Sequence, residues 1–208
     1  VWNGLTDESH PTQILADLMT MDEHTAKPLR DVKACFLGDA KNNTADSFLI
    51  GCAKMGLDVR LTGPEGYLPN EGTIARAEAY AAESGGRILV TTNRDEAVDG
   101  CDFLYTDVWV SLGEPETAWA ERIPLMRPYQ VNADVMASTG NPAVKFLHCL
   151  AAFHDTGTVV GRRIQEQFGI DAMEVTDEVF ESEASVVFDQ AENRMHSIKA
   201  LMVATLAG

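Results

Sequence analysis

The segment Ala34–Asn43, with the sequence ACFLGDAKNN, contains four apolar residues followed by a polar turn and two asparagines. The apolar run predicts a buried β-strand at 34–37, and the helical spacing that follows predicts a helix at 43–55. The further predicted strands are 59–62, 87–91, 103–106 and 145–149, and the further predicted helices between them are 73–83, 117–126 and 133–139. This alternation predicts an α/β fold with a doubly wound, mainly parallel five-stranded sheet and helices on both faces.

Two further helices are expected outside this alternation, one at each end of the chain. The first begins at His10-Pro11-Thr12-Gln13, and the second covers about 185–206, where apolar residues recur at helical spacing. Those apolar residues are Val187, Ala191, Met195, Ile198 and Met202. We therefore expect an inter-domain linking helix in 1–23, an α/β domain in 24–184 and a C-terminal helix in 185–208.

The composition disfavours several classes of protein. The formal net charge of −16 argues against nucleic acid and anionic membranes as partners, and no apolar run has transmembrane length. The four cysteines, Cys35, Cys52, Cys101 and Cys149, form no Cys-x-x-Cys pair, which favours a reducing cytoplasm. The sequence begins at Val1 without a methionine, so we expect it to be part of a longer polypeptide.

Polar residues follow three of the predicted strands, among them Asn43, Asp107, Ser111 and Cys149. Because ligands of open α/β sheets bind beyond the carboxyl ends of the strands, these residues are expected at one rim. Each also has a plainer interpretation: Asn43 caps a helix, Asp107 forms a turn, and Cys149 is a small buried apolar residue. Together they suit a zwitterionic amino acid, with Asp107 binding its ammonium group.

Other kinds of site are disfavoured. The sequence contains no Gly-x-Ser-x-Gly elbow of a hydrolase. No Gly-x-Gly-x-x-Gly follows the first strand, which counts against a nicotinamide oxidoreductase. The histidines His148 and His154 do not have the spacing of metal ligands on a helix. We predict no metal and no cofactor.

Four motifs resemble those of ornithine carbamoyltransferases, in order and in approximate separation. They are His10-Pro11-Thr12-Gln13-x-x-x-Asp17, Asp107-Val108-Trp109-x-Ser111-x-Gly113, Phe146-Leu147-His148-Cys149-Leu150 and Glu192-Asn193-Arg194-x-His196. The first alone would indicate the wider carbamoyltransferase superfamily, whereas the second and third are specific for the ornithine branch. The resemblance covers the whole chain and implies transfer of a carbamoyl group from carbamoyl phosphate to L-ornithine, giving L-citrulline and phosphate in arginine metabolism.

The resemblance also implies roles for individual residues. Those expected at the carbamoyl group are His10, Gln13 and Arg194. Those expected at the α-amino and carboxylate groups of ornithine are Asn43, Asp107, Ser111 and the backbone of Leu112. Those expected at the δ-amine are Cys149 and the carbonyl of Leu150. The expected catalytic residues are therefore Cys149, Arg194 and His10, with Arg194 stabilising negative charge on the carbamoyl oxygen.

The sequence departs from the family pattern at three points. The phosphate-binding Ser-Thr-Arg-Thr motif is absent, and we expect it in a preceding domain toward which the C-terminal helix would pack. The chain alone should therefore be inactive. Leu112 replaces a usual methionine, and Ala151 replaces a proline that typically follows a cis peptide bond. The family further implies a trimer-based homo-oligomer.

Two alternatives stay open. The first is a related carbamoyltransferase for putrescine, agmatine or a modified ornithine, against which Asp107 and Ser111 favour an α-amino acid. The second is a non-catalytic amino-acid-binding module, which would not require His10, Gln13 or Arg194.

Overall fold

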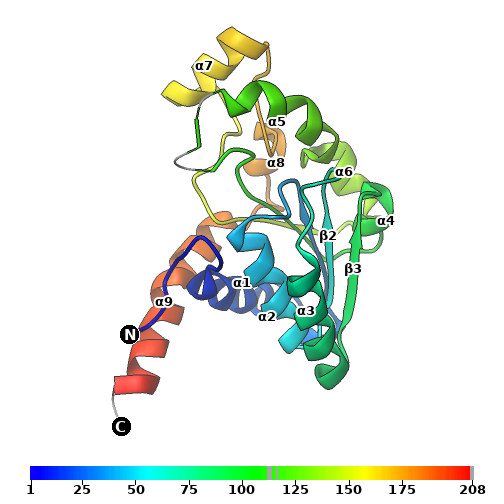
Figure 1. Cartoon of the computed structure of the whole chain (residues 1–208), viewed down its shortest axis with the longest axis vertical. Coiled ribbons are helices and arrows are strands. Elements are labelled where there is room, and N and C mark those ends of the chain that lie inside the picture. Colours follow the sequence, from blue (N-terminus) through cyan, green and yellow to red (C-terminus); the bar gives the residue numbers. More distant parts are fainter. Residues whose placement is uncertain (112–113, 116, 207–208) are drawn as a thin grey trace.

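The computed structural model describes residues 1–111, 114–115 and 117–206, and contains a five-stranded sheet (Figure 1). The strands are β1 (Lys33–Leu37), β2 (Asp58–Thr62), β3 (Arg87–Thr91), β4 (Phe103–Thr106) and β5 (Lys145–His148). All neighbouring strands are parallel, in the order β3-β2-β1-β4-β5, so the chain winds outward from β1 in both directions. The predicted fold class is confirmed.

Helices cover both faces of the sheet because both faces are apolar. In β1, Ala34 and Phe36 belong to one core while Cys35 and Leu37 belong to the other, since successive strand residues point to opposite sides. The helices of the first core are α1 (Pro11–Glu23), α2 (Asn43–Lys54) and α3 (Glu71–Ser84). The helices of the second core include α4 (Arg94–Val98), α6 (Ala133–Ser138) and α8 (Asp177–Phe180).

A third apolar cluster joins the segment after β4 to α5 (Ala118–Met126) and α7 (Val159–Phe168). Its members are Trp109, Val110, Trp119, Ile123, Met126, Ile164, Ile170 and Met173. Figure 1 places α5 and α7 together at one end of the molecule, away from the C-terminus. Trp109 is fully buried there, so the cluster fixes the path of the chain immediately after β4.

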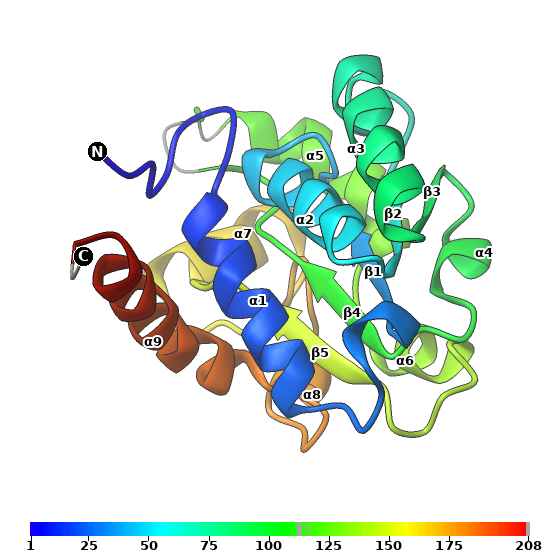
Figure 2. The ribbon, with the colours of Figure 1, turned by 90° about the horizontal axis from the view of Figure 1, so that it is seen from below.

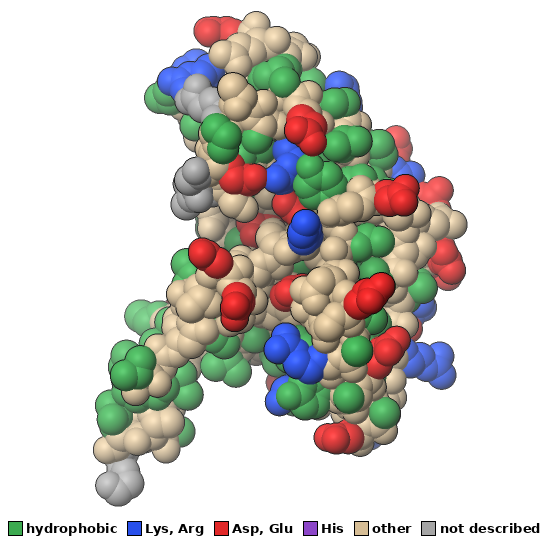
Figure 3. Space-filling view, in the orientation of Figure 1, with side chains coloured by type: hydrophobic (Ala, Val, Ile, Leu, Met, Phe, Trp, Pro, Cys, Tyr) green, Lys and Arg blue, Asp and Glu red, His purple; other side chains and the backbone are tan. Residues whose placement is uncertain are grey.

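The helices at the two ends of the chain, α1 and α9 (Val187–Leu206), lie side by side (Figure 2). Asn193 Nδ2 donates a 3.0 Å hydrogen bond to Thr20 Oγ1 in this buried interface. Farther along α9, Val203 and Leu206 are 59% and 69% exposed, and Figure 3 shows hydrophobic side chains along this end of the molecule. The division into 1–23, 24–184 and 185–208 remains a prediction.

Short connecting helices complete the described chain: η1 (Leu29–Asp31) and η2 (Arg127–Tyr129). Among the helices that the structure describes, none combines the length and the apolar character needed to cross a bilayer. On the face seen in Figure 3, acidic side chains are scattered rather than gathered in one patch.

Candidate functional site

Three neighbouring strands end level with one another. Leu37 at the end of β1 pairs with Thr106 at the end of β4, which pairs with His148 at the end of β5. Thr106 Oγ1 also donates a 2.8 Å hydrogen bond to the Leu37 carbonyl. The segments that follow these strands therefore leave the sheet at one edge, as the parallel arrangement predicted.

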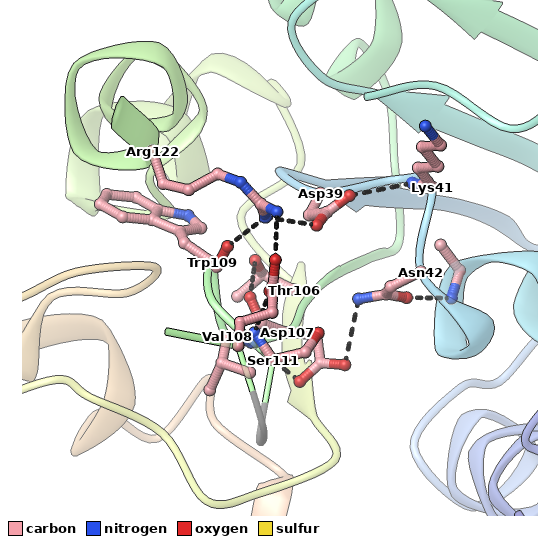
Figure 4. Close-up of polar contacts among 11 residues, drawn as sticks. Asp39, Lys41, Asn42, Thr106, Asp107, Val108, Trp109, Ser111 and Arg122 are labelled. Atoms are coloured by element: carbon pink, nitrogen blue, oxygen red, sulfur yellow. Dashed lines mark hydrogen bonds and ion pairs between the residues drawn. The ribbon is translucent and has the colours of Figure 1, made fainter. Parts of the chain in front are cut away.

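Asp107 lies at the centre of this edge and is half-buried (Figure 4). Asn42 Nδ2 donates to Asp107 Oδ2 at 3.2 Å, and the Cys149 thiol donates to Asp107 Oδ1 at 3.2 Å. The backbone N–H of Val108 donates to the same Oδ1 at 2.8 Å. The structure thus brings Asp107 and Cys149 into direct contact, although 42 positions separate them in the sequence.

The Cys149 thiol is protonated in this environment. Burial raises its pKa well above the usual value, and the negative charge of Asp107 raises it further. A thiolate is the nucleophilic form of cysteine, so this side chain is suited to orienting a ligand rather than to attacking one.

The two consecutive asparagines have different partners. Asn42 is the N-cap of α2, because its Oδ1 accepts a 2.8 Å hydrogen bond from the Ala45 N–H. Asn43 Nδ2 instead donates to the Thr6 carbonyl at 2.7 Å. The interpretation of Asn43 as the helix cap is therefore wrong, and Asn42 is a site residue that sequence reasoning missed. The binding role of Asn43 stays a prediction.

Arg122 of α5 connects two of the segments at this edge (Figure 4). Its Nη1 donates to Asp39 Oδ2 at 2.8 Å and to the Trp109 carbonyl at 2.6 Å, and its Nη2 donates to Glu114 Oε1 at 2.7 Å. Glu114 Oε2 in turn accepts a 2.7 Å hydrogen bond from the Ser111 N–H. Arg122 therefore holds the Ser111 segment against the end of β1, a role that no sequence motif indicated.

An open cavity of about 450 Å³ lies next to these contacts. Its lining residues are Asp39, Lys41, Asn42, Gly66, Tyr67, Ser111, Glu114 and Arg122. The guanidinium of Arg122 stacks over the Tyr67 ring, 4.7 Å from its centre. Burial raises the pKa of Asp39, while the charge of Arg122 opposes that shift. Leu112 and Gly113, predicted in this segment, lie outside the described residues.

The turn after β5 is held by buried polar groups. Leu150 has a φ of 58°, and the Leu150–Ala151 peptide bond is cis. The Leu150 N–H donates to His148 Nδ1 at 2.8 Å, so Nδ1 is an acceptor and the ring N–H is at Nε2, which lies 3.4 Å from Glu174 Oε1. The His148 N–H donates to Gln190 Oε1 at 2.9 Å. These contacts fix the backbone on both sides of Cys149.

A second polar cluster lies between α1 and α9. Arg194 Nη1 is 2.5 Å from Gln13 Oε1 and 3.2 Å from His10 Nε2. His10 Nδ1 is 3.1 Å from the Gly4 carbonyl, which requires the proton on Nδ1 and leaves Nε2 to accept from Arg194. Burial and the charge of Arg194 lower the pKa of His10, so the ring is neutral at neutral pH. The structure thus brings into contact the three residues that were predicted to lie at the carbamoyl group, His10, Gln13 and Arg194.

The two clusters are within electrostatic reach of each other, because the charge of Asp107 acts on His10 and raises its pKa against the larger lowering effects. His10 and Arg194 also line a cavity of about 420 Å³ at the ends of the chain. Potential metal-ligand atoms of Asp107, His148 and Cys149 lie within 4.8 Å of one another. The prediction of a metal-free site stays a prediction.

The chain matches known proteins over nearly its whole length. The family model for the Asp/Orn binding domain of aspartate/ornithine carbamoyltransferase matches residues 30–205. A catabolic ornithine carbamoyltransferase from Rhizobium meliloti (strain 1021) is 55% identical over 207 residues, which are 99% of this chain and 62% of that relative.

Solved structures of ornithine carbamoyltransferases also superpose on nearly the whole chain. The ornithine carbamoyltransferase from Pyrococcus furiosus superposes with a TM-score of 0.85 at 43% identity, covering 99% of this chain and 59% of that one. The enzyme from Gloeobacter violaceus superposes with a TM-score of 0.80 at 36% identity, covering 97% of this chain and 60% of that one. The chain therefore spans less than two thirds of the length of each of these relatives.

Proposed function

Because the chain belongs to the aspartate/ornithine carbamoyltransferase family, we propose that it is the amino-acid-binding part of an ornithine carbamoyltransferase. The reaction moves the carbamoyl group of carbamoyl phosphate to the δ-amine of L-ornithine, and the products are L-citrulline and phosphate. The observation that carries this proposal is the contact of Asp107 with Asn42 and Cys149 beside the neutral His10 and the cationic Arg194.

The amino-acid end of the substrate is assigned to the edge of the sheet. The carboxylate of Asp107 is half-buried and suits the α-ammonium group, whose charge complements it. Asn42, which contacts Asp107, and Ser111 both line the 450 Å³ cavity and offer polar groups to the α-carboxylate, together with the predicted Asn43 and Leu112. With the α-ammonium engaged in this way, the δ-nitrogen is the free nucleophile.

The δ-amine must lose a proton before it attacks, because an alkyl ammonium group has a pKa of about 10.4 in water. The Cys149 thiol is neutral, so it offers no negative charge that would favour the protonated δ-amine. The carbonyl of Leu150 can accept a hydrogen bond from a neutral δ-amine. We assign these two groups to orienting the lone pair of the nitrogen toward the carbamoyl carbon.

The carbamoyl end is assigned to His10, Gln13 and Arg194. Attack by the δ-amine places negative charge on the carbamoyl oxygen, and the guanidinium of Arg194 is suited to stabilise that charge. The neutral His10 can exchange hydrogen bonds with the carbamoyl group without adding a second positive charge. The phosphate then leaves with the electron pair of the broken C–O bond, and it takes up the proton that the attacking nitrogen releases.

Two finer statements belong to the same proposal. The 208 residues contain no Ser-Thr-Arg-Thr motif, so we expect purified Val1–Gly208 to form no citrulline by itself. A cytoplasmic, trimer-based enzyme is expected from the family. A carbamoyltransferase for putrescine, agmatine or a modified ornithine and a non-catalytic amino-acid-binding module are the competing proposals. Ornithine binding without turnover by the complete protein would favour the second.

The test is the formation of citrulline by the complete protein from carbamoyl phosphate and L-ornithine. Arg194→Gln is expected to lower kcat at least about 100-fold, because it removes the charge that stabilises the transition state. Lys199→Gln removes a positive charge from an exposed position of the same helix and is expected to leave kcat unchanged. No citrulline from the unaltered protein, or full activity of Arg194→Gln, would contradict the proposal.

A further inference from the structure

A buried carboxylate lies between the two polar clusters and belongs to neither. Asp17 of α1 is 1% exposed. Its Oδ1 accepts a 2.8 Å hydrogen bond from Gln13 Nε2 and a 2.7 Å hydrogen bond from Gln190 Nε2. The hydroxyl of Tyr105 lies 3.5 Å from the same oxygen. Donors from α1, α9 and β4 thus converge on one acceptor.

The two glutamines extend this contact in opposite directions. The Oε1 of Gln13 accepts from Arg194 in the cluster assigned to the carbamoyl group. The Oε1 of Gln190 accepts from the His148 N–H, next to the Cys149–Leu150 turn assigned to the δ-amine. An amide has its donor and its acceptor on opposite arms, so an acceptor that binds the NH2 group also determines where the oxygen points.

We propose that Asp17 is a positioning residue that sets the orientation of Gln13 and Gln190 and thereby aligns the carbamoyl cluster with the Cys149–Leu150 turn. This inference rests on the proposed function of the two clusters. Asp17 touches no substrate in this scheme; it acts through the two amides. Without an acceptor at this point, each amide could rotate by half a turn and present its NH2 group where its oxygen is required.

The surroundings of Asp17 support this role. The titratable and charged groups that face it are Cys52 of α2, Tyr105 of β4, Cys149 after β5 and Arg194 of α9. Burial raises the pKa of both thiols and of the phenol, so these three groups are neutral at neutral pH. Arg194 is the cation among them, and Gln13 connects it to Asp17. Burial raises the pKa of Asp17 to about 7, so the acid and the carboxylate are both present near neutral pH. In either form Oδ1 can accept from both amides, and the side chain offers no competing N–H donor.

The inference is tested by steady-state kinetics of citrulline formation in the complete protein. Asp17→Ala removes the acceptor and is expected to lower kcat at least about tenfold, with the KM for ornithine changed less than about threefold. Asp17→Asn keeps an oxygen acceptor and is expected to retain kcat within about threefold. The matched control is Thr20→Val, which removes the hydrogen bond donated to the Ala16 carbonyl and the one accepted from Asn193, in the same helix interface, without touching either glutamine.

Gln190→Leu supplies an independent readout. In the Gln190→Leu background, Asp17→Ala should lower kcat by a factor at least about threefold smaller than in the unaltered protein, because the Gln190 contact of Asp17 is already lost. Additive losses would mean that Asp17 serves only stability and would overturn the inference. Equal effects of Asp17→Ala and Thr20→Val, or no better activity with Asp17→Asn than with Asp17→Ala, would also overturn it.

If Asp17→Ala does not fold, the kcat of the Gln190→Leu variant alone tests the inference. It should lower kcat at least about fivefold, and an unchanged kcat would overturn the inference. An unaltered protein that forms no citrulline would overturn the proposed function, and this inference with it. An active unaltered protein whose variants behave like Thr20→Val would overturn the inference alone.

Discussion

Asp17→Asn is expected to make the free energy of unfolding less dependent on pH. Burial raises the pKa of Asp17 from 3.8 to about 7, and hydrogen bonds from Gln13, Gln190 and Tyr105 offset only part of that effect. Between these two values the folded chain holds the proton more tightly than the unfolded chain does. The free energy of unfolding therefore has its largest contribution from this group below pH 3.8 and loses it as the pH rises through about 7.

The size of this effect follows from the shift. One pH unit within the window changes the free energy of unfolding by about 1.4 kcal/mol for one group. Raising the pH from about 5 to about 8 crosses roughly two units of the window, so the ionisation of Asp17 should cost about 2.5 kcal/mol. Asparagine does not titrate, so the variant is expected to gain about that much relative to the unaltered protein over the same range.

Urea unfolding followed by circular dichroism at several pH values measures this difference. Asp22→Asn, at an exposed position of the same helix, controls for the loss of one negative charge. The stability difference between Asp17→Asn and the unaltered protein should grow by about 2.5 kcal/mol toward high pH, well beyond that of the control. A difference that changes by less than about 0.5 kcal/mol over this range would refute the argument that Asp17 is buried as an acid with a raised pKa.

Three further changes have expected outcomes. Asp107→Asn should raise the KM for ornithine at least about tenfold, because the α-ammonium loses its counter-charge, and an unchanged KM in initial-rate assays would contradict this. Arg122→Met removes the ion pair that holds Glu114 and should raise the KM for ornithine about three- to tenfold; unaltered KM would show that this segment is held by other contacts. Gly63→Ala should lower the free energy of unfolding by about 1–3 kcal/mol in urea titrations, since the added Cβ would lie 2.2 Å from a backbone oxygen, whereas at Gly4 it would meet nothing within 4 Å. Equal stability of Gly63→Ala and Gly4→Ala would contradict that packing.

The sheet and the position of the site were predictable because both depend on short-range patterns. Apolar runs bounded by polar turns placed every strand within one residue of its observed bounds. The parallel order then placed Asp107 and Cys149 at one edge without any knowledge of their contact. The helix α7 was missed, although the sequence contains a residue typical of each helix end. Thr158 caps its start, and Gly169 ends it in the left-handed conformation.

The remaining features depend on contacts between distant parts of the chain. Asn42 and Asn43 are chemically identical neighbours, and only the start of α2 decides which of them caps the helix and reaches Asp107. Arg122 meets Asp39 across 83 positions, and no local pattern marks an arginine on an amphipathic helix as a site residue. Asp17 is the last residue of the motif that begins at His10, but its contacts with the amides of Gln13 and Gln190 are visible only in the packed interface of α1 and α9.

The most direct test of the proposed function is the choice of amine by the complete protein. The measurement is kcat/KM for L-ornithine and for putrescine, with carbamoyl phosphate saturating and both carbamoylated products quantified. A site in which Asp107 binds an α-ammonium group should prefer ornithine at least about 100-fold. Equal values for the two amines, or a preference for putrescine, would contradict the assignment of Asp107 and the amino-acid site built around it.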